Sequence, residues 1–521
     1  MKTRSPAPAV TIALLVGACS AGGSRPSDGT GSDADSDADT DADTDGDTDG
    51  DTDADADGDT DTFISTDGYG EVLPLCWLRT FPAEDRLQIS DMALLSDGSA
   101  VLAGRYRGAA VFGQGEPGEI ILESTTTDVF DFFLARVGAD GDLLWAKRTG
   151  AVDEDSQTVA VEVFADGGIA LAGSFQGTAV LGAGEPNETT LVSAGDEDLF
   201  VARYSEDGAL VWARRDGGDT KVQFHGSGAM ADGSLVVTGH HNGPVIFGEG
   251  EPNEIALEAP LGSTTFIARY QGDGKLAWAA TISGNPTGRE IASSIEGSSI
   301  VFAWQMGPFI RSITPLPSLD WIYTGWGLYG DGNPVRMGDG SYVVAGMFNG
   351  TMTMECGGTL LEFFAPWEKG NRTHFWSSAF AMRLTADGEC LWAFDADNEP
   401  WNMAAAGSAS PRPGGGFLLS GVFFGAVGFG EGDPADTWLA STGHPEPFVG
   451  AYDDDGNIER ISRVASQCEE VNAAQIASLA NGSFLLAGDF SGTATFLDTD
   501  AQPVEVASTG QTDGFLMRVC P

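Results

Sequence analysis

Positively charged residues are scarce in this chain of 521 residues, which has 26 Lys and Arg against 77 Asp and Glu. The formal net charge is −51 at pH 7. A surface this acidic repels phosphate backbones, so nucleic acid is excluded as a partner. No apolar run in the sequence approaches the ~20 residues of a transmembrane helix.

Catalytic signatures are absent as well. The chain has only five histidines, and it contains no GxSxG elbow, no HExxH pair and no P-loop. We therefore expect a protein that is not an enzyme and that carries no resident cofactor. Ca²⁺ is the one ion for which the acidic residues leave binding as an alternative.

The N-terminus has the features of an export signal. Lys2 and Arg4 precede a short apolar stretch that ends in Val16-Gly17-Ala18-Cys19. This ending resembles the bacterial lipobox, which implies cleavage after residue 18 and lipidation of Cys19. Ser20 follows the cysteine, and by analogy with that family it favours the outer membrane. The alternative is an ordinary signal peptide with a chance cysteine.

An acidic spacer follows the lipobox. From Asp33 to Asp61 every odd position is Asp, with no basic residue between them. Such a tract cannot bury apolar surface, and its charges repel one another, so residues 19–62 should form a disordered linker. The segment Asp41–Gly46 looks like part of a DxDxDG calcium loop, but it lacks the bidentate Glu. We therefore expect a linker that holds the folded domain away from the lipid anchor.

A phrase close to DGGxxLAGxFxG recurs along residues 63–521. The fourth of its seven copies is degenerate and has Ala303 where the others have a marker glycine. The copies are Asp97–Gly108, Asp166–Gly177, Asp232–Gly243, Glu296–Gly307, Asp339–Gly350, Gly414–Gly425 and Asn481–Gly492. Each full repeat reads as four strands, because alternating apolar residues are separated by Asp-Gly turns. Tandem four-stranded antiparallel units predict an all-β, seven-bladed β-propeller.

A second phrase, DGxLxW, places one tryptophan in the outer hairpin of most repeats. We expect these tryptophans to pack between neighbouring blades. They are Trp145, Trp212, Trp278 and Trp392.

The two ends of the repeat region complement each other. The last copy stops after its third strand, at residues 513–521, whereas Leu73–Thr80 supplies an extra strand in which Trp77 takes the tryptophan place. We expect this N-terminal strand to complete the last blade. It would bring Cys76 beside Cys520, and export favours a disulfide between them. Three cysteines remain, Cys356, Cys390 and Cys468. Because their number is odd, we expect one disulfide pair and one buried thiol among them.

The phrases LFVARYSEDGALVWARR and GGIALAGSFQGTAVLGAGEPNE resemble the SBBP-type β-propeller repeats of secreted bacterial proteins. The resemblance covers roughly Leu73 to Pro521. It implies a propeller outside the cytoplasm and no particular activity. DGxLxW is also similar to the TGxxxW phrase of quinone-cofactor propellers, but the adjacent cysteine pair of those enzymes is missing.

Two features are candidates for recognition. The insertion Pro366–Ser378 gathers Trp367, Arg372, His374 and Trp376 in an acidic domain, and Pro308–Trp326 is rich in aromatics. The alternative is that these aromatics cover the end of a blade. The GxGEPNE loops, such as Gly182–Glu188 and Gly248–Glu254, are either cation sites or charged turns.

The preferred interpretation is a lipid-anchored outer-membrane propeller that faces the cell exterior. It would act as a non-enzymatic binding, adhesion or scaffold module for a polysaccharide or protein ligand. One alternative is a periplasmic scaffold lipoprotein of the outer membrane. The other is a carbohydrate-active hydrolase or lyase whose carboxylates converge at the axis of the ring.

Overall fold

The computed structural model describes residues 74–126, 129–152, 159–259, 262–282, 299–303, 309–313, 319–324, 326–328, 334–365, 377–398, 402–430, 437–497 and 502–520. These residues belong to one unit, Phe63–Pro521, and all of its described elements are strands. Cys19 and the Asp-rich segment lie outside the described residues.

Six sheets are built on four antiparallel strands each, written here from the innermost to the outermost strand. The first three are β2 (Arg86–Leu94), β3 (Ala100–Arg107), β6 (Phe130–Val137) and β7 (Leu143–Val152); β8 (Val159–Val163), β9 (Ile169–Phe175), β12 (Asp198–Tyr204) and β13 (Leu210–Asp216); and β14 (Val222–Ala229), β15 (Leu235–His241), β18 (Thr264–Tyr270) and β19 (Leu276–Ile282). The other three are β24 (Val335–Arg336), β25 (Tyr342–Cys356), β27 (Ser378–Leu384) and β28 (Cys390–Asp395), with β23 (Trp326–Leu328) beside β25; β30 (Met403–Pro411), β31 (Phe417–Phe424), β34 (Glu446–Tyr452) and β35 (Ile458–Arg463); and β36 (Ala465–Ser478), β37 (Phe484–Leu497), β39 (Asp513–Val519) and β1 (Leu75–Phe81).

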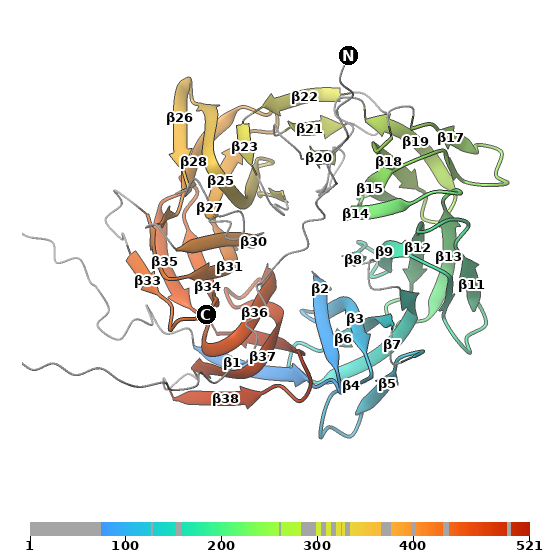
Figure 1. Ribbon diagram of the computed structural model, residues 1–521, viewed down its shortest axis with the longest axis horizontal. Coiled ribbons are helices and arrows are strands. Elements are labelled where there is room, and N and C mark those ends of the chain that lie inside the picture. Colours follow the sequence, from blue (N-terminus) through green and yellow to red (C-terminus); the bar gives the residue numbers. More distant parts are fainter. Residues whose placement is uncertain are drawn as a thin grey trace, which may run out of the picture. The chain divides into compact units, whose positions relative to one another are not determined.

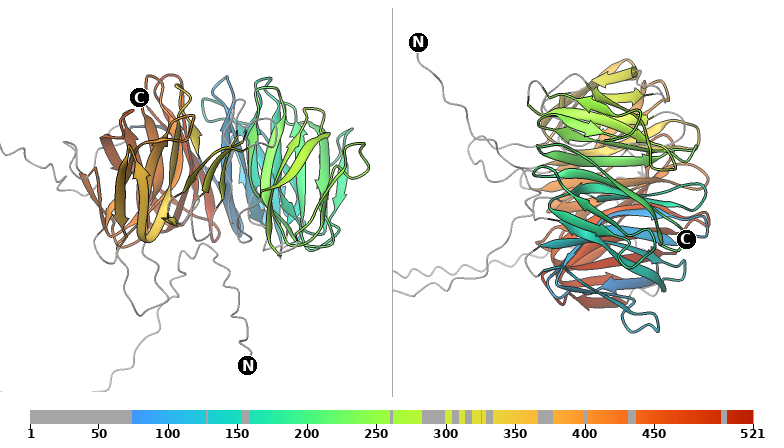
Figure 2. Two further views of the ribbon diagram at one scale, coloured as in Figure 1. Left: turned by 90° about the horizontal axis from the view of Figure 1, so that it is seen from above. Right: turned by 90° about the vertical axis from the view of Figure 1, so that its right-hand side faces the viewer.

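The sheets are arranged around an axis as the blades of a propeller (Figure 1). The innermost strands β2, β8, β14, β30 and β36 face this axis, and consecutive blades pack face to face through them. In side view the strands run roughly along the axis (Figure 2). A three-stranded sheet of β20 (Ser299–Ala303), β21 (Phe309–Ile313) and β22 (Leu319–Thr324) stands between the third and the next four-stranded sheet, where the degenerate repeat was predicted.

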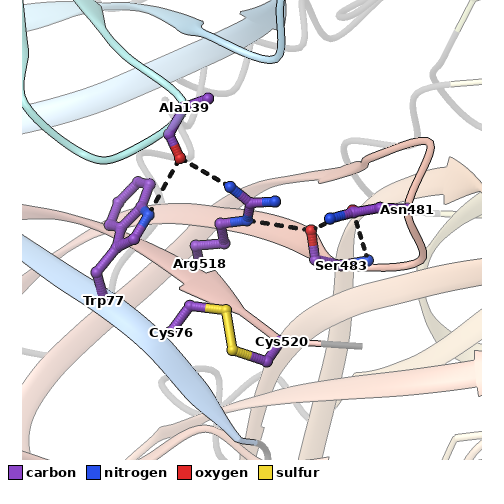
Figure 3. The surroundings of a disulfide bond; sticks show 7 residues. All are labelled: Cys76, Trp77, Ala139, Asn481, Ser483, Arg518 and Cys520. Atoms are coloured by element: carbon purple, nitrogen blue, oxygen red, sulfur yellow. Dashed lines mark hydrogen bonds between the residues drawn. A yellow bond between two sulfur atoms is a disulfide. The ribbon is translucent and has the colours of Figure 1, made fainter.

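The predicted ring closure is confirmed. Strand β1 pairs with β39 from Leu75↔Val519 to Phe81↔Gly514, so the N-terminal strand is the outermost strand of the last blade. Cys76 and Cys520 form a disulfide at the end of this pair, with their Cα atoms 5.2 Å apart (Figure 3). A second disulfide joins Cys356 and Cys390.

Each of the six four-stranded blades also carries an outer arm, which the sequence prediction did not include. These hairpins run along the perimeter of the ring (Figure 1). Four of them are separate pairs of short strands: β4 (Ala109–Phe112) and β5 (Ile120–Glu123), β10 (Thr178–Leu181) and β11 (Thr189–Val192), β16 (Val245–Phe247) and β17 (Ile255–Leu257), and β32 (Ala426–Phe429) and β33 (Thr437–Ala440). The other two are formed by the end of β25 with β26 (Thr359–Phe364) and by the end of β37 with β38 (Pro503–Ala507). Strand β29 (Asp397–Asn398) pairs with β32. The sequence prediction of four strands per repeat was therefore incomplete.

At four described junctions the DGxLxW tryptophan and the arginine of the FxARY phrase together latch one blade to the next. At the closing blade, Trp77 Nε1 and Arg518 Nη1 both donate to the carbonyl oxygen of Ala139, at 3.3 and 2.8 Å (Figure 3). The indole ring also lies against Gly141, where an added Cβ would come within 2.9 Å of the ring. Glycine at this turn therefore lets the tryptophan of the preceding blade approach.

The same latch recurs at three further junctions, each time on the carbonyl oxygen two residues before a turn glycine. The pairs are Trp145 and Arg136 on Glu206, Trp212 and Arg203 on Gly272, and Trp392 and Arg383 on Asp454. The expected packing of Trp145, Trp212 and Trp392 between blades is confirmed. The counterpart of Trp278 falls outside the described residues, so its packing stays a prediction.

Replacing Trp212 by Phe should lower the free energy of unfolding by about 1 kcal/mol, because the hydrogen bond to Gly272 is lost while most of the ring contact remains. Urea unfolding of the purified protein measures this loss. The matched control is Val211→Ala at the exposed neighbouring position, which should change stability by less. Equal effects of the two substitutions would contradict the latch.

Candidate functional site

Two acidic residues interrupt the apolar alternation of neighbouring innermost strands. Asp91 lies on β2 and Glu162 on β8, and both residues are half-buried. Asp91 Oδ2 accepts a hydrogen bond from the backbone N–H of Val161 at 2.8 Å. Glu162 Oε1 accepts from the Ser227 hydroxyl on β14 at 3.1 Å. The two carboxyls therefore link three successive blades.

The surroundings of this pair oppose ionisation. Burial raises the pKa of Asp91 to about 6, although hydrogen bonds from the N–H groups of Val161 and Met92 lower it. Burial, and then the negative charge of Asp91, raise the pKa of Glu162 to about 8. Two neighbouring carboxyls with separated pKa values are the arrangement that acid and base catalysts use. Here, however, both carboxyls also hold neighbouring strands together.

Polar links continue to the blades on the other side of β2. Ser408 Oγ on β30 donates to Gln475 Oε1 at 3.2 Å, and Gln475 Nε2 on β36 donates to the carbonyl oxygen of Ser90 at 3.3 Å. Asp91, Ser408 and Gln475 occupy the same register position, one residue beyond a β-bulge opposite the marker glycine. These residues form an inner belt that joins five successive blades through their innermost strands.

Stability should depend on pH through Glu162. The pKa of this carboxyl in the folded state lies above its ordinary value, so the folded protein retains a proton that the unfolded chain releases. Wild-type stability should therefore fall as the pH rises from about 4.5 to about 8. We expect Glu162→Gln to be more stable than wild type by ~2 kcal/mol at pH 8, where this figure takes the partial exposure of the carboxyl into account. Near pH 4.5 the variant and wild type should be equally stable.

Guanidinium unfolding at the two pH values measures this difference. Exposed Glu123 on β5 provides a charge-matched control, because Glu123→Gln removes one carboxylate outside the inner belt. A Glu162→Gln stability that follows the wild-type pH profile would contradict the assignment.

The acidic GxGEPNE loops serve the fold. In the first three blades a loop glutamate (Glu116, Glu185 or Glu251) accepts a hydrogen bond from the first N–H of the outermost strand of its own blade. The same glutamate pairs with a basic residue of the preceding blade, as Glu251 does with Arg214 at 2.7 Å. The last glutamate of each loop accepts an N–H bond from a glycine of its own turn. Of the two alternatives for these loops, the geometry favours the charged turn.

The fourth outer hairpin replaces this glutamate with a disulfide. Cys356 ends the first arm of the hairpin, and Cys390 is the first residue of the outermost strand β28. Their bond ties the hairpin to the strand that the glutamates cap elsewhere, and Gly357 N–H donates to the Cys390 carbonyl at 3.1 Å. Nothing is described of the side chain of Cys468.

Buried acids at the start of the third strands are structural too. Asp131 and Asp198 are fully buried, and each accepts the backbone N–H of a residue in the loop that follows the outer hairpin. Glu446 and Asp513 repeat this contact in later blades. Burial raises the pKa of Asp131 and Asp198, and their hydrogen bonds and the neighbouring Arg148 and Arg215 act against that shift.

The described structure does not test the residues predicted for recognition. Trp367, Arg372, His374 and Trp376 all lie outside the described residues. Within Pro308–Trp326 the backbone forms β21, β22 and the start of β23. The sequence analysis missed Asp91 and Glu162 as a pair. The available signal was a single acidic residue inside each of the strands Arg86–Leu94 and Val159–Val163.

Among the described residues, no group of three or more His, Cys, Asp or Glu side chains is arranged to hold a metal ion. The described part of the chain likewise contains no helix long and apolar enough to cross a membrane.

Neither a family model nor a curated protein matches the chain. Solved structures match at low identity. The quinohemoprotein alcohol dehydrogenase from Comamonas testosteroni is 10% identical over 85% of this chain and 76% of its own, with a TM-score of 0.34. The C-terminal WD40 domain of Sif2 is 10% identical over 87% and 100%, with a TM-score of 0.36. A mutant of puromycin hydrolase is 12% identical over 81% and 53%, with a TM-score of 0.41.

This chain is a β-propeller by the arrangement of its own sheets. A likeness this distant assigns no activity to the propeller described here.

Proposed function

We propose that this propeller is an exported lipoprotein that binds a ligand at the cell surface and performs no chemistry on it. Two disulfides among the described residues support export, because such bonds persist in oxidising compartments. Lipidation at Cys19 and the Asp-rich linker of residues 19–62 would hold the ring away from the outer membrane.

The observation that supports a binding function is that the repeated polar residues bond to other residues of the ring. The arginine–tryptophan latches, the loop glutamates and the buried acids of the third strands all make hydrogen bonds within the ring. They maintain a rigid scaffold, and the segments that differ between blades remain for recognition. The insertion Pro366–Ser378 is our first candidate, and its aromatic and basic residues suit a polysaccharide or an acidic protein.

We further propose that the ring has seven blades of the SBBP type. The three-stranded sheet β20–β22 would be the fourth blade, reduced by the degenerate repeat around Ala303. Its position in sequence between two complete repeats supports this count.

Protease shaving of intact cells tests the location. Release of the propeller from intact cells is expected, with a lysed-cell sample as the control for protease access. Protection in intact cells and loss after lysis would instead favour a periplasmic scaffold, and the surface-binding function would be wrong.

Ligand binding is tested with a panel of polysaccharides and partner-cell surfaces. Trp367→Ala combined with Trp376→Ala should reduce retention at least tenfold. The control is Trp438→Ala on the outer strand β33, where the exposed tryptophan lies far along the sequence from the insertion. Unchanged retention by the double variant would remove Pro366–Ser378 as the site.

A second candidate function is carbohydrate cleavage by Asp91 and Glu162. The observation that favours it is their proximity on neighbouring innermost strands with separated pKa values. Reducing-sugar release from the same polysaccharides, lost in Glu162→Gln and Asp91→Asn, would support it. No release by the wild-type protein would exclude it for those substrates.

A further inference from the structure

The Cys76–Cys520 disulfide occupies the position of a missing turn. In the first blade, Val137 at the end of β6 pairs with Leu143 at the start of β7, and the intervening residues form the turn between these strands. In the closing blade the equivalent pair is Val519 with Leu75. No turn can join them, because the two strands come from opposite ends of the chain. The disulfide restores a covalent connection at this place.

Cys76 has a defined structural position. The β1–β39 register skips one residue between Leu75 and Trp77, which leaves Cys76 at a bulge with its side chain exposed. The same skip in β7 leaves Leu144 exposed. Cys520 follows β39 directly, and its N–H donates to the carbonyl oxygen of Pro74 at 2.7 Å. Cysteine therefore occupies both of the positions that Leu144 and Gly138 hold in the first blade.

This position is also where the N-terminal segment joins the ring. The chain before Pro74 leads into β1, and Cys76 is the second residue of that strand. Tension on the N-terminal segment would act first on the Leu75 end of the β1–β39 ladder. Without a covalent bond, the ladder could open residue by residue toward Trp77 and Arg79. Opening would remove the Ala139 and Gly141 contacts that latch the last blade to the first.

We propose that the Cys76–Cys520 disulfide is a force-bearing junction that passes tension from the N-terminal tether directly to β39. Strand β1 then stays paired while the propeller holds its ligand. This inference rests on the proposed function of a membrane-tethered binding module, because a freely diffusing propeller experiences no such tension.

The second disulfide provides a matched control. Cys356–Cys390 joins an outer hairpin to the outermost strand within a single blade, 34 residues apart in sequence, and does not involve β1. Its removal should affect the stability of that blade without changing how tension enters the ring.

Optical-trap measurements on the full chain test the proposal. One handle is attached at the N-terminus of a Cys19→Ser protein, and the other at a click-reactive residue that replaces exposed Ala231 in the turn between β14 and β15. The oxidised protein should show no step before the main unfolding event. Cys76→Ala/Cys520→Ala should add an early, reversible step of ~2–3 nm, which is the extended length of the strand Leu75–Phe81. Cys356→Ala/Cys390→Ala should show no early step.

Two results would overturn the junction. The first is an early step of the same size in the oxidised protein. The second is that neither the Cys76/Cys520 variant nor the reduced protein shows the early step. Adding reductant to Cys356→Ala/Cys390→Ala during pulling gives the same test if the Cys76/Cys520 variant fails to fold. The purified protein needs neither anchor nor ligand here, so protease shaving can contradict the proposed location independently of this measurement.

Discussion

Gly104→Ala should leave the purified protein largely unfolded at 37 °C. A Cβ at this position would lie 2.1 Å from the carbonyl oxygen of Gln88 and 2.7 Å from the ring of Phe133. The carbonyl belongs to the innermost strand and the ring to the third strand, so neither can withdraw without breaking the packing of the blade. We expect a loss of about 3 kcal/mol or more, at the upper end of the cost of overpacking a core.

The matched control is Gly118→Ala in the outer hairpin of the same blade. No atom other than the Leu143 carbonyl oxygen, at 3.9 Å, lies within 4 Å of its added Cβ, and its backbone is not in the left-handed region. Urea unfolding should shift by less than ~0.5 kcal/mol for this variant. Gly239 and Gly421 have the same close contacts as Gly104, so alanine there should be equally damaging. Three well-folded alanine variants would contradict this explanation of the marker glycine.

Loss of the Cys76–Cys520 disulfide should destabilise the protein more than loss of Cys356–Cys390. The first bond closes a loop with a sequence separation of 444 and the second one of 34. The chain-entropy model gives a stabilisation of ~6 kcal/mol for the longer loop and ~4 kcal/mol for the shorter one. The first double alanine variant should therefore unfold at the lower guanidinium concentration.

Guanidinium unfolding of both double variants, with wild type measured with and without reductant, checks this order. Reductant should lower the midpoint of wild type below that of either double variant kept oxidised. Equal losses in the two variants would mean that the ladder and the Trp77 and Arg518 latch already close the ring, and that the long loop contributes little.

The prediction of the fold succeeded where the information is local. Asp-Gly turns and alternating apolar residues specify a hairpin within about ten residues, so each four-stranded unit could be identified from its own repeat. The missing final strand and the surplus N-terminal one could be matched because both carry their place in the repeat, with Trp77 as the marker. The outer arms of the first three blades were missed because their strands are only three or four residues long and are separated by a glycine-rich acidic loop.

The sequence by itself therefore determined the repeat, the antiparallel units and the strand exchange that closes the ring. Only the tertiary structure decided what the polar residues do. The charge of Asp91 acts on Glu162, and Arg203 donates to the Gly272 carbonyl, across junctions that separate partners by about seventy residues in the chain. Residue spacing encodes contacts within a hairpin, whereas the partners of a side chain across a blade junction depend on how two complete sheets pack. Burial between those sheets also sets the pKa of Glu162, which no spacing in the sequence could reveal.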